Sequence, residues 1–134
     1  MNPKKLLPMF VTDKLAETKA FYTEKAGFAI THDMDGYLSV HYGDEDGPEL
    51  AFAASETDVM GKLPLFGGEG IIVSIPTPNA DRKAKEMTSH GVKLLGQPET
   101  RPWGWRSFMA ADPNGVILDF FHVPAENAGA DAKG

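Results

Sequence analysis

Residues 36–53 read GYLSVHYGDEDGPELAFA, and residues 104–121 read GWRSFMAADPNGVILDFF. Aligned so that Gly36 matches Gly104, and without any gap, the two stretches share six identical positions, and Tyr37 matches Trp105. Chance gives about one identity in such a window. The identical pairs are Gly36/Gly104, Ser39/Ser107, Asp44/Asp112, Gly47/Gly115, Leu50/Leu118 and Phe52/Phe120. The chain therefore contains an internal duplication, and a residue found in only one copy is a candidate for function.

The duplication continues upstream with a slightly shorter spacing between the copies. The matched pairs there are Val11/Ile75, Ala16/Ala80, Ala20/Ala84 and Gly27/Gly91. The change in spacing predicts four extra residues in the second copy, in a loop near Gly96–Trp103. Because a period of about 65 residues is too long for a solenoid repeat, we interpret the two copies as halves of one domain.

Composition limits the classes of function. A chain of 134 residues with a net charge of −6 is one soluble domain, and its acidity argues against binding nucleic acid or anionic membranes. It contains no cysteine, which excludes disulfides and thiolate chemistry. No apolar stretch reaches the length of a membrane span. We expect a cytoplasmic protein.

Each copy is predicted to fold as β-α-β-β-β, which gives an α+β protein with a mixed, mostly antiparallel sheet and helices on one side. In the first copy we expect strands over 6–12, 28–31, 37–42 and 49–53 and a helix over 14–26; in the second, strands over 71–75, 92–95, 105–110 and 116–121 and a helix over 79–90. The repeat units span about 5–54 and 69–123 of a single domain at 5–123, with a linker at 55–69 and a disordered tail at 124–134.

Several short motifs accompany this element order. They are Phe21-Tyr22, Ala26-Gly27-Phe28, Arg101-Pro102-Trp103-Gly104 and Asp112-Pro113-Asn114-Gly115. With the duplication, they resemble the vicinal oxygen chelate superfamily of glyoxalases, extradiol dioxygenases and bleomycin-resistance proteins, over about residues 5–123. The resemblance implies that the two units curl into a U-shaped trough that holds the site, with the helices outside. It also implies a homodimer.

Metal-dependent members of that superfamily hold their ion at four positions, which fall on Leu6, Ala51, Gly70 and Asp119 in this chain. Three of these residues have no ligand atom in the side chain, and one carboxylate alone does not make a hard-metal site. Glu49 lies two residues from Ala51, so an ion site formed by Glu49 and Asp119 together stays open as an alternative. We therefore expect no metal and no cofactor, as in the metal-free branch that resembles bleomycin-resistance proteins.

Strand alternation, counted from those four positions, predicts an apolar trough with two acids as polar anchors. Two neighbouring tryptophans in the inserted loop can stack on a planar ligand or attract a cation. The predicted ligand-binding residues are Phe10, His41, Glu49, Ala51, Ile72, Trp103, Trp105, Asp119 and Phe121.

The sequence thus favours a metal-free protein that binds a small aromatic or cationic molecule. Two alternatives remain open at this stage. One is a metal-dependent lyase, isomerase or dioxygenase of the same superfamily. The other is a metal-free enzyme in which Asp119 or Glu49 acts as a general base, a role that burial of a carboxyl group favours.

Overall fold

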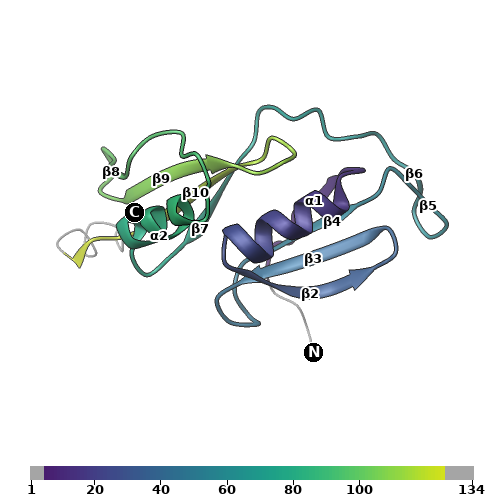
Figure 1. Cartoon of the computed structure of the whole chain (residues 1–134), viewed down its shortest axis with the longest axis horizontal. Coiled ribbons are helices and arrows are strands. Elements are labelled where there is room, and N and C mark those ends of the chain that lie inside the picture. Colours follow the sequence, from purple (N-terminus) through teal and green to yellow (C-terminus); the bar gives the residue numbers. More distant parts are fainter. Residues whose placement is uncertain (1–4, 126–134) are drawn as a thin grey trace. The chain divides into compact units, whose positions relative to one another are not determined.

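Each copy of the duplicated sequence folds into a four-stranded sheet with a helix packed on one face (Figure 1). The structure is a computed structural model that describes residues 5–125, and it divides into two units between Glu69 and Gly70. From residue 126 on, the predicted tail lies outside the described residues.

The first unit contains β1 (Met9–Val11), α1 (Leu15–Ala20), a π-helical turn η1 (Phe21–Lys25), β2 (Phe28–Met34), β3 (Tyr37–Tyr42) and β4 (Glu49–Ala53). Its strand order is β1-β4-β3-β2, with β1 and β4 parallel and the other pairs antiparallel. The predicted linker contains a small hairpin of β5 (Glu56–Thr57) and β6 (Gly61–Lys62).

The second unit contains β7 (Ile72–Pro76), α2 (Ala80–Ser89), β8 (Glu99–Thr100), β9 (Arg106–Ala111) and β10 (Ile117–His122). Its order, β7-β10-β9-β8, repeats that of the first unit, again with one parallel pair. The side chain of Asn79 caps α2 by accepting a hydrogen bond from Arg82 N. The predicted α+β class with mixed, mostly antiparallel pairing is confirmed.

Two strands differ from the expectation. The first strand was expected over 6–12, but β1 covers only Met9–Val11, and Leu6 is 87% exposed. The strand expected over 92–95 is reduced to a single bridge between Leu94 and Ala110. The inserted loop supplies β8 in its place, and β8 pairs with β9. Strand propensity alone did not predict that β8 pairs with β9, because the insertion displaces the segment that pairs with β9 by several residues.

The helix of the first unit contains one more residue than that of the second. Ala26 N donates to Phe21 O, five residues earlier, which is the bond of a π-helical turn. Before this turn Thr12 is the structural equivalent of Thr77, since each donates its backbone N–H at 2.8 Å to the equivalent carbonyl of the neighbouring strand. After the turn Gly27 is the equivalent of Gly91, and both adopt positive φ. The sequence alignment predicted for the first strand was therefore wrong by one position.

The cores of the two units lie between sheet and helix. In the first unit Tyr22 is fully buried, and its ring lies 5.2 Å from that of Phe52. In the second, Phe108 and Phe120 are fully buried and stacked at 5.6 Å. The identities Leu50/Leu118 and Phe52/Phe120 are all in these cores, at 2% exposure or less. The duplication preserved the packing between sheet and helix.

Candidate functional site

In the second unit, alternate residues of β10 point toward α2 and away from it. Phe120 faces the helix, because Lys83 Nζ of α2 lies 5.3 Å from its ring centre. Asp119 and Phe121 therefore point to the other side. We call that side the distal face of the second unit. Alternation along β10 places Ile117 there too, and the residues that pair with these positions on the neighbouring strands add Ile72, Ser74, Ser107 and Met109.

Asp119 lies in the middle of this distal face. It is only 8% exposed, between Ser74 of β7 and Met109 of β9 in the register. Ser74 Oγ donates a hydrogen bond of 2.8 Å to Asp119 Oδ2. The other oxygen, Oδ1, is buried and has no hydrogen-bond partner among the described residues. A buried polar atom of this kind is uncommon in native proteins and requires an explanation.

Aromatic side chains lie beside this carboxylate. Trp105 stacks on Phe121, with ring centres 4.1 Å apart and planes inclined by 10°. Phe121 is two residues from Asp119 on the same face of β10, a separation of about 7 Å. Ile72 on β7 is 57% exposed. The distal face thus combines one acid with an aromatic stack and exposed apolar surface.

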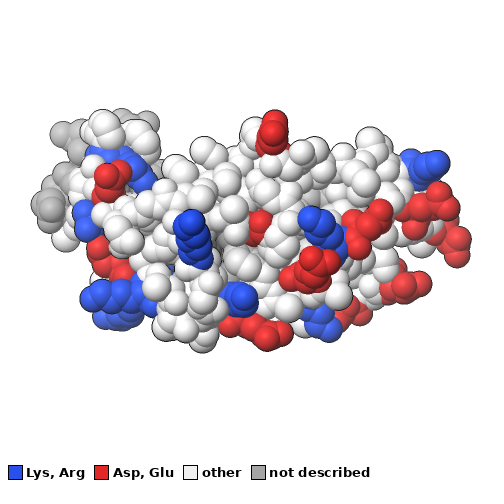
Figure 2. Space-filling model, turned by 45° about the horizontal axis from the view of Figure 1, so that its top comes forward, with Lys and Arg blue, Asp and Glu red and all other residues white. Residues whose placement is uncertain are grey.

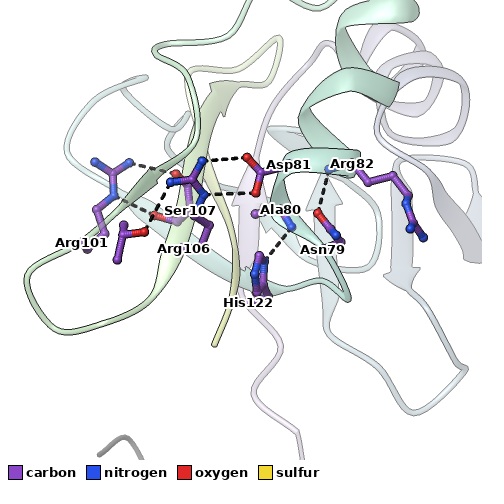
Figure 3. A network of polar contacts seen from close by, with 9 residues as sticks. Asn79, Ala80, Asp81, Arg82, Arg101, Arg106, Ser107 and His122 are labelled. Atoms are coloured by element: carbon purple, nitrogen blue, oxygen red, sulfur yellow. Dashed lines mark hydrogen bonds and ion pairs between the residues drawn. The ribbon is translucent and has the colours of Figure 1, made fainter. Parts of the chain in front are cut away.

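Arg101 fixes the loop that carries Trp105. Its Nε donates to the buried Ser107 Oγ at 2.8 Å (Figure 3). Its Nη1 contacts Glu99 Oε2 at 2.7 Å. Arg101 N also donates to Trp105 O at 2.7 Å. Trp103, by contrast, is 63% exposed at the tip of this loop. Of the two tryptophans, Trp105 is the one held against the sheet.

In the first unit the distal face carries His41, Glu49 and Ala51. Phe52 faces the helix, so Ala51 and Glu49 alternate with it to the other side, and His41 lies directly across from Glu49. Glu49 Oε1 forms an ion pair of 3.0 Å with Lys5, whose ammonium also donates to two carbonyl groups of the β3–β4 loop. Unlike Asp119, Glu49 already has a positive partner.

The structure corrects the predicted position of Phe10. Its register partner is Phe52, on which it stacks at 5.9 Å, and it is 6% exposed in the core on the helix side. The distal residue of β1 at this level is Met9, which pairs with Ala51. The prediction assumed regular alternation from Leu6 onward. Leu6 lies outside β1, which begins at Met9, so alternation from Leu6 gave the wrong side for Phe10.

The opposite side of the second sheet carries a polar network at the start of α2 (Figure 3). Arg106 binds both carboxylate oxygens of Asp81, at 3.1 and 2.9 Å. These bonds lower the pKa of Asp81 and raise the pKa of Arg106. His122 Nδ1 accepts from Ala80 N at 2.8 Å, so His122 faces away from Asp119, as alternation along β10 requires. This network anchors α2 to the sheet.

The donor set does not fit the metal site of the metal-dependent relatives. Leu6 and Gly70 precede their strands, and neither has a ligand atom. Ala51 has none either, and one oxygen of Asp119 is bonded to Ser74. Among residues 5–125 no three His, Cys, Asp or Glu side chains lie close enough together to bind an ion.

Surface features elsewhere are less specific. A groove of about 410 Å³ lies between the outer side of α2 and the inserted loop, on the side of the second unit that carries Asp81, Lys85 and Gln97. On the face shown in Figure 2, acidic and basic side chains are interspersed among wide uncharged areas. Within the described part of the chain, no helix has the length and apolarity needed to cross a bilayer.

Sequence reasoning missed several polar residues of the distal faces. Arg101, Lys5, Thr31 and His32 were not among the predicted site residues. The identity Ser39/Ser107 could have indicated two of them, His32 and Arg101. Both serines are buried, and a buried hydroxyl group needs a hydrogen-bond partner. Ser39 finds His32 at 3.2 Å, and Ser107 finds Arg101.

Comparison with known proteins identifies the family. The family model of the Glyoxalase/Bleomycin resistance protein/Dioxygenase superfamily matches residues 7–120. No curated protein is similar enough to count as a match.

Solved structures share the fold at low sequence identity. A glyoxalase/bleomycin resistance protein/dioxygenase from Nocardioides superposes with a TM-score of 0.70 at 22% identity, over 93% of this chain and 87% of its own. A bleomycin resistance determinant encoded on transposon Tn5 gives 0.69 at 19%, over 90% and 98%. An integron cassette protein of V. cholerae gives 0.69 at 16%, over 91% and 97%. The chain belongs to the glyoxalase/bleomycin resistance protein/dioxygenase superfamily.

Proposed function

We propose that the chain binds a small planar or cationic molecule on the distal face of its second unit, without a metal ion or cofactor. The observation that carries this proposal is the buried Asp119 Oδ1, which has no partner among residues 5–125. Leaving a charged acceptor buried without a hydrogen bond costs more than about 1–3 kcal/mol. An N–H or ammonium group of a ligand would supply the missing bond.

The aromatic stack supports a planar ligand. Trp105 and Phe121 lie beside Asp119 on the same face. A tryptophan ring offers a large flat surface for stacking and attracts cations. A molecule that carries a donor next to an aromatic or planar group would engage both features.

The donor set supports a metal-free site. The side chains at Leu6, Ala51 and Gly70 offer no ligand atom, so a metal-dependent lyase, isomerase or dioxygenase has no support from these positions. Elemental analysis of the purified protein separates the alternatives. We expect no stoichiometric divalent metal. A bound metal that is lost in Asp119→Ala would contradict the proposal.

The alternative with a catalytic base has less support. Glu49 is neutralised by Lys5, which leaves Asp119 as the acid to test. A turnover whose pH dependence disappears in Asp119→Asn would favour a metal-free enzyme over a binding protein.

Tryptophan fluorescence tests the binding proposal directly, because the chain has two tryptophans. We expect a saturable change for at least one member of a panel of aromatic and cationic compounds. Bleomycin belongs in this panel, since a structure similar to this chain is a bleomycin resistance determinant. The change is expected to persist in Trp103→Phe and to be lost in Trp105→Phe. No saturable change across the panel would contradict the proposal.

A homodimer is part of the same proposal, and it rests on the resemblance to superfamily members that dimerise. Light scattering on the purified chain tests it. We expect twice the monomer mass at micromolar concentration, and a monomer at all concentrations would contradict it.

A further inference from the structure

The distal face of the first unit contains two histidines that the proposed function does not use. His41 Nδ1 lies 2.7 Å from Thr31 Oγ1, and His32 Nδ1 lies 3.2 Å from Ser39 Oγ. Within the described part of the chain these are the only side-chain hydrogen bonds of either histidine. One nitrogen of each ring is thus held by a hydroxyl group, and Nε2 of each ring remains.

A β-bulge brings these four side chains to one face. In β2, Ile30 pairs with Val40 and His32 pairs with Ser39, so Thr31 is the extra residue. Consecutive residues of a regular strand point to opposite faces. At the bulge, however, Thr31 and His32 both contact residues of the distal face, His41 and Ser39. Bulges re-aim side chains in this way and are common beside functional sites.

The hydroxyl groups allow both imidazoles to act as donors through Nε2. A hydroxyl can donate to a neutral imidazole nitrogen or accept from a protonated one. When Thr31 donates to Nδ1 of neutral His41, the ring proton is on Nε2, and after protonation Nε2 still carries a proton. The same holds for Ser39 and His32. In this tautomer each ring presents an N–H group at Nε2, whether the ring is neutral or protonated.

Two carboxylates next to the histidines are already paired with lysines. Glu49, across from His41, forms its ion pair with Lys5. Asp33, next to His32, bonds Lys19 of α1 at 2.6 Å on the helix side. β2 is the edge strand of its sheet, so no further strand adds a charge beside it. No unpaired carboxylate of the described residues neutralises the two imidazoles.

We propose that His32 and His41 form an oxyanion site that takes a carboxylate or phosphate group of a small molecule. The two residues are diagonal neighbours on adjacent strands, and such neighbours lie about 7–8 Å apart. From positions at this spacing, two imidazole side chains can bring their Nε2–H groups to two oxygens of one anion. This site is in the first unit and is independent of the donor-binding role of Asp119.

Histidine NMR tests this proposal on the unmodified protein, because the chain has four histidines that single variants assign. Inorganic phosphate and acetate are the two probes, and they distinguish a phosphate from a carboxylate preference. We expect saturable shifts of the His32 and His41 ring signals with at least one probe.

His90 is the matched control, since it is exposed at the end of α2. We expect His41→Gln and His32→Gln each to weaken anion binding about tenfold, the effect of losing one charged hydrogen bond, and His90→Gln to leave it unchanged. Ring signals of His32 and His41 that move no more than those of His90 would overturn the proposal. So would anion binding that survives in both glutamine variants.

Discussion

Ser74 and Asp119 share one hydrogen bond across the parallel strands β7 and β10, and that bond occupies only half of the carboxylate. Ser74 Oγ donates to Oδ2 at 2.8 Å, and Oδ1 is buried without a partner among the described residues. In the first unit the equivalent strands carry Met9 and Ala51. The polar pair therefore exists in one copy of the duplication only, on the face away from the helix.

Replacing Ser74 by Ala leaves both oxygens of Asp119 without a protein partner. We expect the free energy of unfolding to fall by about 1–3 kcal/mol, because a buried acceptor loses its hydrogen bond. Urea denaturation measures this change. The double variant Ser74→Ala/Asp119→Leu should recover most of the loss, since removing both partners of a buried pair is close to neutral. Equal stability of wild type and Ser74→Ala would be evidence against a buried bond.

Phe10 and Met9 provide a test of the corrected register. Phe10→Ala removes a ring from the core of the first unit and should lower the free energy of unfolding by about 3–5 kcal/mol. Met9 is 41% exposed on the distal face. Met9→Ala should therefore cost well under half as much in the same urea denaturation experiment. The reverse order would mean that Phe10 points away from the helix, as alternation from Leu6 had predicted.

Arg101 should determine the environment of Trp105. Arg101→Met keeps the length of the side chain but removes its bonds to Ser107 and Glu99. We expect red-shifted tryptophan emission, because the loop no longer holds Trp105 on Phe121. Recording it in a Trp103→Phe background isolates the signal. Arg82→Met, on the exposed side of α2, is the control and should leave the emission unchanged.

Asp13 should make stability depend on pH in the acid range. Ser55 N and Oγ donate to its carboxylate at 2.9 and 2.8 Å, and these bonds lower the pKa of Asp13 below 3.8. A lowered carboxyl pKa adds stability above its unfolded value, and this stability is lost as the pH falls through the folded value.

Urea denaturation between about pH 2 and pH 6 checks this. Asp13→Asn should remove the part of the acid sensitivity that arises below pH 3.8 and leave the slope above about pH 5 unchanged. Parallel pH profiles for wild type and Asp13→Asn would contradict the interpretation.

The sequence sufficed for the fold because the duplication is visible in its core. Leu50/Leu118 and Phe52/Phe120 are kept by packing against the helices, and residue identity reveals that constraint directly. The register of the first strand was not predictable in the same way. It depends on one extra residue that the chain absorbs in the π-helical turn at Phe21–Lys25, far from β1. Sequence alignment cannot tell where a helix absorbs such a residue.

The candidate site was predictable in part for the same reason. Asp119 appeared as the acid that breaks the symmetry with Ala51, and alternation on β10 gave its face correctly. The bulge at Thr31 and the bonds of Lys5 and Arg101 depend on tertiary geometry, which sequence spacing does not encode. They decide which acids and histidines of the two distal faces have partners.

The most direct test of the central claim is the dissociation constant of the tightest ligand from the fluorescence panel, measured for Asp119→Asn beside wild type. We predict an affinity at least about tenfold weaker, because the ligand loses a charged hydrogen bond in a buried setting. Asp44→Asn, at the exposed tip of the β3–β4 loop, is the control with the same change in charge and should bind as wild type does. Equal affinities for wild type and Asp119→Asn would contradict the account.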